Sequence, residues 1–139
     1  MYILSAEAEF DSAHFLSGYD GKCSNIHGHR WKTVVEIQGE KLNTEGQLRG
    51  MLTDFGDLKK DVKALADSLD HAFIIETGTL ETELLEMLKK RFRIIEFPFR
   101  PTAENFAEYV YNEMEKKGYD VLTATVFETP TNKATYRKA

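Results

Sequence analysis

The stretch YILSAEAEFDSAHF, residues 2–15, has the alternating pattern that determines the fold. Tyrosine, leucine, alanine and phenylalanine occupy the even positions from 2 to 10, and acidic residues occupy positions 7, 9 and 11. Successive side chains of a β-strand point to opposite faces of a sheet, so the pattern predicts a strand with one buried face. The alternation brings His14, near the end of the stretch, to one face of that sheet.

The segments that follow predict a loop, a second strand and a hairpin connection. Residues 16–25 hold two glycines together with serine, aspartate and asparagine, a composition typical of a loop. Residues 30–39 contain a Thr-Val-Val-Glu-Ile run that favours a strand. Residues 40–50 are polar and contain two glycines, which predicts a hairpin connection.

Three helices are expected in the remainder of the chain. Asp54 has the character of an N-cap, and apolar residues then recur every three or four positions as far as Leu69. Residues 80–92 carry leucines and a phenylalanine at four-residue steps and predict a second helix. Thr102 can cap a third helix that ends at Gly118.

The order of the predicted elements gives the fold class. Residues 121–128 and 134–137 have the character of two final strands, and the short apolar run 94–97 is a candidate for one more. Strand, strand, helices, strand, strand predicts an α+β fold with a four-stranded antiparallel sheet and helices on one face. The length of 139 residues suits a single domain spanning residues 1–139.

Composition and charge exclude several functional classes. A net charge of −5 and a pI of about 5.4 argue against a nucleic-acid-binding surface. The single cysteine excludes an intrachain disulfide. The acidic N-terminal segment is not a signal peptide, and no apolar run approaches the roughly 20 residues that span a bilayer. We expect a cytoplasmic protein that binds neither nucleic acid nor membrane and acts on a small molecule.

Three of the four histidines form a candidate metal site. His27 and His29 stand two residues apart, so an extended backbone would send both imidazoles to the same face. Antiparallel pairing of the first two strands would bring His14 beside them. Three neutral imidazoles suit zinc and leave a fourth position open, as in catalytic sites. The alternative is that these are unrelated surface or core histidines, because a His-x-His pattern also occurs by chance.

Cys23 is a candidate general base. It stands four residues before His27, where a bound zinc ion would favour its thiolate form. A thiolate can take a proton from a carbon whose neighbouring oxygen is bound to the metal. The alternative role, a small buried apolar residue, is the commoner one for a free cysteine but fits poorly with the polar segment 21–25.

Four further acidic or histidine residues have both a functional and a structural interpretation. Asp70 can orient the imidazole of His71, although a histidine at a helix C-terminus is also favoured by the helix dipole. Glu104 either contributes to a pocket or complements the dipole at a helix N-terminus. Glu128 ends a strand, where its carboxylate either accepts two parallel N–H bonds from a planar guanidine-like edge or points to solvent.

Six short motifs, in order, resemble those of one known family. They are FDSAH (10–14), CSNIHGH (23–29), LTDFGDLK (52–59), LDH (69–71), PTAEN (101–105) and FET (127–129). The chain resembles the 6-pyruvoyltetrahydropterin synthase and 6-carboxytetrahydropterin synthase family over nearly its whole length. Any one motif is weak evidence, but six in the right order are highly specific.

The resemblance implies a fold, an assembly and a set of site residues. It implies the tunnelling fold, in which subunits form a trimeric antiparallel barrel, usually stacked in pairs as a hexamer, with active sites between subunits. By this likeness Cys23 is the proton acceptor, Asp70 and His71 form a relay that reaches the site from a neighbouring subunit, and Glu128 anchors the pterin ring and joins the proton relay. The remaining residues that the resemblance implies are the zinc ligands His14, His27 and His29, and Thr102 and Glu104 near the pterin pocket.

Within the family, the spacing around the His-Gly-His motif favours one branch. Three residues separate Cys23 from His27, as in the bacterial 6-carboxytetrahydropterin synthases, and no glutamate of the folate branch lies between them. The resemblance thus implies a zinc lyase of queuosine biosynthesis acting on 7,8-dihydroneopterin triphosphate. A 6-pyruvoyltetrahydropterin synthase and a non-catalytic zinc- or pterin-binding module remain alternatives. Residues 76–100 form a longer segment than in the shortest members, and we expect it to alter a sheet edge or a subunit contact rather than the chemistry.

Overall fold

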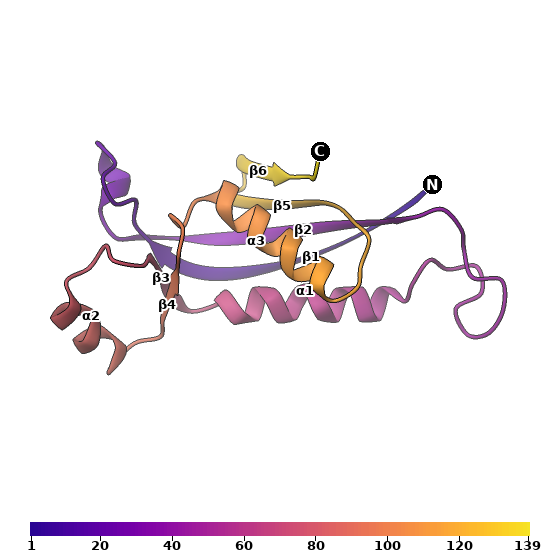
Figure 1. Ribbon diagram of the computed structural model, residues 1–139, viewed down its shortest axis with the longest axis horizontal. Coiled ribbons are helices and arrows are strands. Elements are labelled where there is room, and N and C mark those ends of the chain that lie inside the picture. The colour runs from indigo at the N-terminus through magenta and orange to yellow at the C-terminus, as the bar shows by residue number, and fades with distance from the viewer.

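The computed structural model describes residues 1–139, and two long paired strands run through its centre (Figure 1). A short 3-10 turn, η1, spans Lys22–Ser24 in the loop between those strands. The strands and helices, in chain order, are β1 Tyr2–His14, β2 His27–Gly39, α1 Phe55–Leu69, β3 Ala72–Glu76, α2 Thr82–Lys89, β4 Ile94–Phe97, α3 Ala103–Lys116, β5 Val121–Thr129 and β6 Asn132–Tyr136.

The sheet is six-stranded and mixed, which corrects the predicted four antiparallel strands. Its order is β4-β3-β1-β2-β5-β6, with β3 parallel to both β1 and β4. The prediction missed β3, the apolar run AFIIE that follows α1 directly. Helix α1 returns the chain along the sheet after β2, so the next strand runs in the same direction as β1 and pairs with it in parallel.

One connection and one helix also differ from the prediction. Residues 40–50 do not form the predicted hairpin, because the chain leads from β2 into α1 rather than into another strand. The hairpins of this sheet join β1 to β2, through residues 15–26, and β5 to β6, through residues 130–131. Helix α2 lies apart from α1 and α3 (Figure 1). It is shorter than predicted and buries none of its residues, so no packed apolar face extends it to residue 92.

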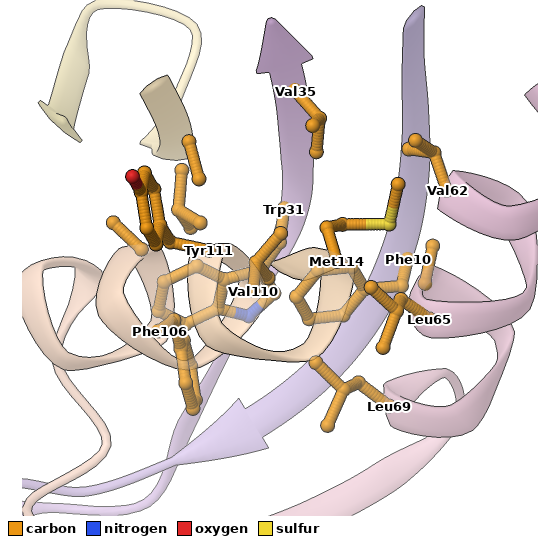
Figure 2. Close-up of a cluster of buried hydrophobic side chains, with 14 of the residues drawn as sticks. Phe10, Trp31, Val35, Val62, Leu65, Leu69, Phe106, Val110, Tyr111 and Met114 are labelled. Carbon is orange, nitrogen blue, oxygen red and sulfur yellow. The ribbon is translucent and has the colours of Figure 1, made fainter. Parts of the chain in front are cut away.

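The core lies between the sheet and the helices α1 and α3, which cover one face as predicted (Figure 2). Phe10 of β1 and Trp31 of β2 are direct partners in the β1–β2 register, and both are fully buried. The ring of Phe106 from α3 packs edge-on against Trp31 at 5.0 Å between centroids. These three aromatic rings pack the ends of β1 and β2 against α3.

The helix starts agree with the predicted caps. The Asp54 carboxylate accepts a hydrogen bond from the Gly56 N–H at 2.7 Å, and the Thr102 hydroxyl accepts one from the Asn105 N–H at 3.2 Å. No helix combines the length and the apolar character that a membrane span requires.

Candidate metal centre and active site

The β1–β2 register places three histidines together at one end of the sheet. His14 is directly opposite His27, and His29 is opposite Ser12, two positions further along. All three share the face of Trp31, because side chains two residues apart point the same way. His14 is only 1% exposed, whereas His27 and His29 are half-buried at the rim.

The ring nitrogens of these histidines converge on one point. One nitrogen from each of the three rings lies within 4.8 Å of the other two, and the Nε2 atoms of His14 and His27 are 3.0 Å apart. The Nδ1–H of His14 donates to the Pro101 carbonyl at 2.7 Å, and the Nδ1–H of His27 donates to the Asn25 carbonyl at 2.7 Å. With each Nδ1 protonated, both Nε2 atoms carry lone pairs that face one another.

A divalent metal ion fits this arrangement. Two nitrogens on a tetrahedral zinc ion, each about 2.0 Å from it, lie about 3.3 Å apart, close to the observed separation of the His14 and His27 nitrogens. The Nε2 atom of His29 is buried without a hydrogen-bond partner, a cost that a metal ion would remove. The carbonyls of Asn25 and Pro101 serve as the outer partners that commonly orient metal-binding imidazoles.

Burial keeps the candidate ligands in the form that binds a metal. Desolvation by burial lowers the pKa of His14, and this effect outweighs its hydrogen bond to Pro101. Burial likewise lowers the pKa of His29 despite the opposing charge of Glu128. Both imidazoles are therefore neutral at neutral pH, as metal coordination requires.

Glu128 lies beside the histidines at the end of β5. Its Oε1 atom is 3.6 Å from Nε2 of His29, and the strand shifts register between Phe127 and Thr129, where such irregularities re-aim side chains. Glu128 and Glu104 line the same cavity of about 370 Å³, with Asn132 and Lys133 at its side. The structure thus brings two of the predicted pocket residues together, next to the helix that Thr102 caps.

Cys23 lies outside the histidine cluster, in the loop between β1 and β2. It belongs to η1, is half-buried, and its carbonyl accepts a hydrogen bond from the Leu16 N–H at 2.8 Å. Arg100 donates to the Ser17 carbonyl at 2.5 Å and ties this loop to the segment that carries Pro101. The cysteine loop and the His14 ring are therefore held by neighbouring residues of one segment.

Asp70 and His71 form a second, separate group. Nδ1 of His71 lies 2.8 Å from Oδ2 of Asp70, and the other oxygen of Asp70 accepts from the Asp11 N–H at 2.8 Å. The Asp11 hydrogen bond, followed by the one from His71, lowers the pKa of Asp70, which keeps it ionised. The His71 side chain is 79% exposed and belongs to no group with the three-histidine cluster.

Three parts of the site escaped the sequence analysis. The carbonyls of Asn25 and Pro101 have no signature, since any residue supplies a carbonyl, and Pro101 is far from His14 in the chain. Trp31, whose ring packs edge-on against His14 at 4.9 Å and His29 at 5.2 Å, could have been found. It shares the alternation of His27 and His29, which predicts the same face.

The fold and the site define a class: an α+β protein with a cluster of three histidines, able to hold a metal ion, at the end of its longest strand pair. A profile of the 6-pyruvoyl tetrahydropterin synthase family matches residues 3–139. The chain is 39% identical over 142 residues to a 6-carboxy-5,6,7,8-tetrahydropterin synthase of Haemophilus influenzae, covering 99% of this chain and 100% of that one. It is 30% identical to the Synechocystis protein of the same name, covering 98% and 93%.

Solved structures agree with this relationship at the level of the fold. A 6-pyruvoyltetrahydropterin synthase of Plasmodium vivax superposes with a TM-score of 0.71 at 22% identity, covering 99% of each chain. The Caenorhabditis elegans 6-pyruvoyl tetrahydropterin synthase gives 0.64 at 27% identity, covering 100% of this chain and 98% of that one. The chain belongs to the 6-pyruvoyl tetrahydropterin synthase family, and it is an enzyme of that family.

Proposed function

We propose that the protein is a zinc-dependent 6-carboxy-5,6,7,8-tetrahydropterin synthase. This carbon–carbon lyase would convert 7,8-dihydroneopterin triphosphate and one water molecule to 6-carboxy-5,6,7,8-tetrahydropterin, acetaldehyde and triphosphate, a step toward queuosine and other deazapurines. The observation that carries the proposal is the convergence of His14, His27 and His29 beside Glu128. The choice of this branch is supported by the full-length relatives at 30–39% identity, which bear this name.

His14, His27 and His29 would hold the metal. A zinc ion bound there would supply Lewis-acid stabilisation of negative charge that develops on oxygens of the substrate side chain. The apolar ring of Trp31 excludes water from the inner side of the histidines, which strengthens electrostatic interactions at the site.

Glu128 would hold the pterin ring. A carboxylate at this position can accept two parallel N–H bonds from the guanidine-like edge of a pterin. Such an anchor fixes the side-chain carbons relative to the metal ligands, so that proton transfers take place within one complex. Glu104, on the same cavity, would line the pocket near the ring, and Thr102 would position it by fixing the start of α3.

Cys23 would accept a proton from a side-chain carbon, and the Asp70–His71 pair would relay protons as an acid and a base. The His71 imidazole is exposed and grouped apart from the histidine cluster of its own chain. This separation supports an assembly in which His71 serves the site of a neighbouring copy. We therefore propose a homo-oligomer, a barrel of three subunits paired into a hexamer, with its sites between subunits.

Product analysis tests the proposed reaction. Purified zinc-loaded protein is incubated with 7,8-dihydroneopterin triphosphate, and the pterins, acetaldehyde and triphosphate are quantified. Equal amounts of acetaldehyde and a 6-carboxy pterin are expected. A pyruvoyl pterin without acetaldehyde would move the protein to the 6-pyruvoyltetrahydropterin synthase branch. Tight pterin binding with no turnover would instead indicate the non-catalytic module.

A further inference from the structure

The connection between α1 and β3 consists of Asp70 and His71 alone, the two residues of the proposed relay. Helix α1 ends at Leu69, Asp70 is extended, and β3 begins at Ala72. His71 has a φ of +50°, the only positive φ at a residue other than glycine. Residues other than glycine are uncommon in this left-handed region, and holding one there costs of the order of 1 kcal/mol. Contacts with other segments must therefore hold the connection in this shape.

One set of such contacts comes from β1. The His71 N–H donates to the Asp11 carbonyl at 2.7 Å, and the Asp11 N–H donates to the Asp70 carboxylate at 2.8 Å. The Ser12 hydroxyl donates to the Leu69 carbonyl. These bonds fix one side of the connection to the strand that ends at the metal site.

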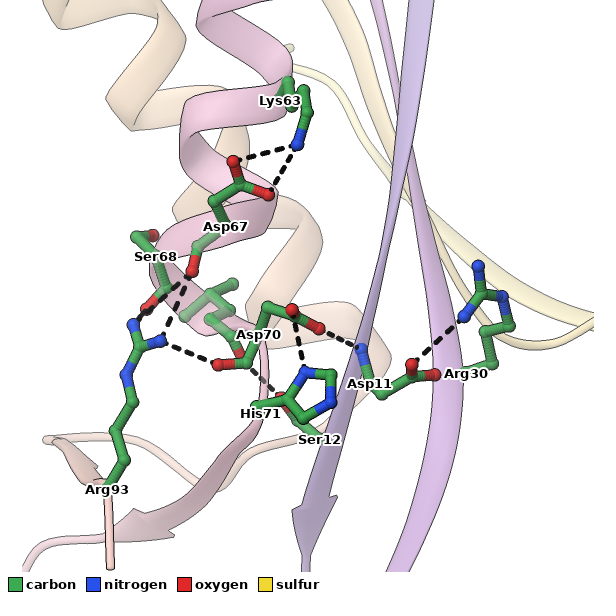
Figure 3. A network of polar contacts seen from close by, with 10 residues as sticks. Asp11, Ser12, Arg30, Lys63, Asp67, Ser68, Asp70, His71 and Arg93 are labelled. Carbon is green, nitrogen blue, oxygen red and sulfur yellow. Dashed lines mark hydrogen bonds and ion pairs between the residues drawn. The ribbon is translucent and has the colours of Figure 1, made fainter.

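The other side is held by a single side chain, Arg93 (Figure 3). Its guanidinium donates to the Asp70 carbonyl at 2.7 Å and to the Ser68 carbonyl at 2.5 Å, with the Asp67 carbonyl at 3.4 Å. The last carbonyls of a helix lack partners within it, and a cation there is favoured by the helix dipole. Arg93 thus supplies both the hydrogen bonds and the charge that the end of α1 needs.

The pairing of β3 with β4 brings Arg93 to this place. Arg93 is the residue directly before β4, and its carbonyl accepts from the Phe73 N–H at 2.9 Å. Phe73 lies two residues after His71, so the same backbone contact that starts the β3–β4 ladder also sets the position of Arg93. Segment 76–100, which we expected to affect only an edge or a subunit contact, therefore reaches the relay pair.

We propose that Arg93 is a positioning residue for the Asp70–His71 pair, clamping the connection that carries it. The inference rests on the proposed function, because the pair matters for turnover only if it moves protons. Arg93 contacts carbonyl oxygens rather than the Asp70 carboxylate, which is held by Asp11 and His71. It acts through the geometry of the backbone, and its removal would let Asp70 and His71 leave their present orientation.

Two variants separate the charge of Arg93 from its forked geometry. Arg93→Lys keeps the charge but cannot bridge several carbonyls at once, and Arg93→Gln removes the charge. Arg91→Gln is the matched control, because Arg91 lies in the same segment and only its backbone N–H is engaged, with Leu88. Both Arg93 variants are expected to lower kcat roughly 10- to 100-fold, with KM within about twofold and zinc content unchanged. Arg91→Gln is expected to match the wild type.

Backbone amide exchange tests the clamp without substrate. The amides of Asp11 and His71 should exchange about 10-fold faster in Arg93→Gln, while the Trp31 amide in the core keeps its rate. If the amides of Asp11 and His71 exchange as slowly in Arg93→Gln as in the wild type, the inference is overturned. It is also overturned if the wild-type protein is active and Arg93→Gln has the same kcat. If the wild-type protein has no lyase activity, the proposed function fails, and the exchange rates still decide whether Arg93 positions the pair.

Discussion

Two of the three histidines are oriented by different backbone carbonyls, His14 by Pro101 and His27 by Asn25. His27 is oriented only by the Asn25 carbonyl and lies at the rim, yet its Nε2 atom faces that of His14 at 3.0 Å. We predict that His27→Ala loses both zinc and activity, measured as metal content by mass spectrometry and as product formed. His71→Ala is the control, expected to keep its zinc. Full zinc occupancy in His27→Ala would contradict the ligand assignment.

Cys23 lies apart from the ligands, and this placement makes its proposed role separable from metal binding. Cys23→Ala should keep wild-type zinc content and lower turnover by roughly 100-fold or more if the thiol is the general base. The comparison is made under saturating substrate, with zinc measured in the same sample. Near-normal turnover would remove Cys23 from the mechanism.

For single residues, the sequence predicts the site correctly where strand alternation decides which face a side chain occupies. It does not predict hydrogen-bond partners that are backbone carbonyls. The parity of His27 and His29 and the end position of His14 were sufficient to predict that the three meet. The carbonyls of Asn25 and Pro101 could not be predicted, because a carbonyl carries no residue-specific signal. Arg93 was missed for a related reason, since its acceptors are also carbonyls.

Among the helices, α3 has the closest connection to the candidate metal centre. Pro101 precedes its cap Thr102, and the Pro101 carbonyl orients His14. Thr102→Ala should lower the free energy of unfolding by about 1 kcal/mol, because the first turn of the helix loses a hydrogen-bond acceptor. Urea unfolding of protein from which a chelator has removed any metal gives this value. Thr102→Ser, which keeps a hydroxyl, is the matched control. Equal stability of the alanine and serine variants would contradict a capping role.

Elements with strong local signals were predicted well, and those defined by distant pairing were not. The cap at Asp54 and the apolar periodicity of α1 lie within one short stretch, so that helix starts where the sequence predicts. Strand β3 has only five residues, and its partners β1 and β4 lie elsewhere in the chain. The composition of residues 40–50 predicts a hairpin wrongly, because polar, glycine-containing stretches look alike whether a strand or a helix follows.

For the whole molecule, the lowered pKa of Asp70 predicts how stability depends on pH. A carboxyl whose pKa is lower in the folded state stabilises the fold above its unfolded pKa, about 3.9, and this stabilisation is lost as pH falls through the folded pKa. The difference in unfolding free energy between wild type and Asp70→Asn should shrink as pH falls from about 5 to about 3. Denaturant titrations across that range measure it, with Asp20→Asn in the exposed loop as the control. A difference that persists unchanged at pH 3 would contradict the assignment.

The proposed assembly makes the strongest prediction at this scale, because it distributes one site over two chains. Each site would combine Cys23 and the metal ligands of one copy with His71 of its neighbour. Cys23→Ala therefore removes the group that one copy supplies to the site, and His71→Ala removes the group that the other copy supplies. Mixing the two inactive variants, after dissociation and reassembly, creates interfaces where an intact Cys23 meets an intact His71.

Random assembly would restore about one quarter of the wild-type sites, because each partner of an interface is intact in half of the copies. Turnover of the reassembled mixture is compared with that of each variant taken alone through the same treatment, and light scattering follows the oligomer. Recovery would place the relay in the neighbouring subunit's site. Mixed oligomers that form and remain inactive would show that Asp70 and His71 act only on the site of their own chain, which would contradict a site shared between neighbouring subunits.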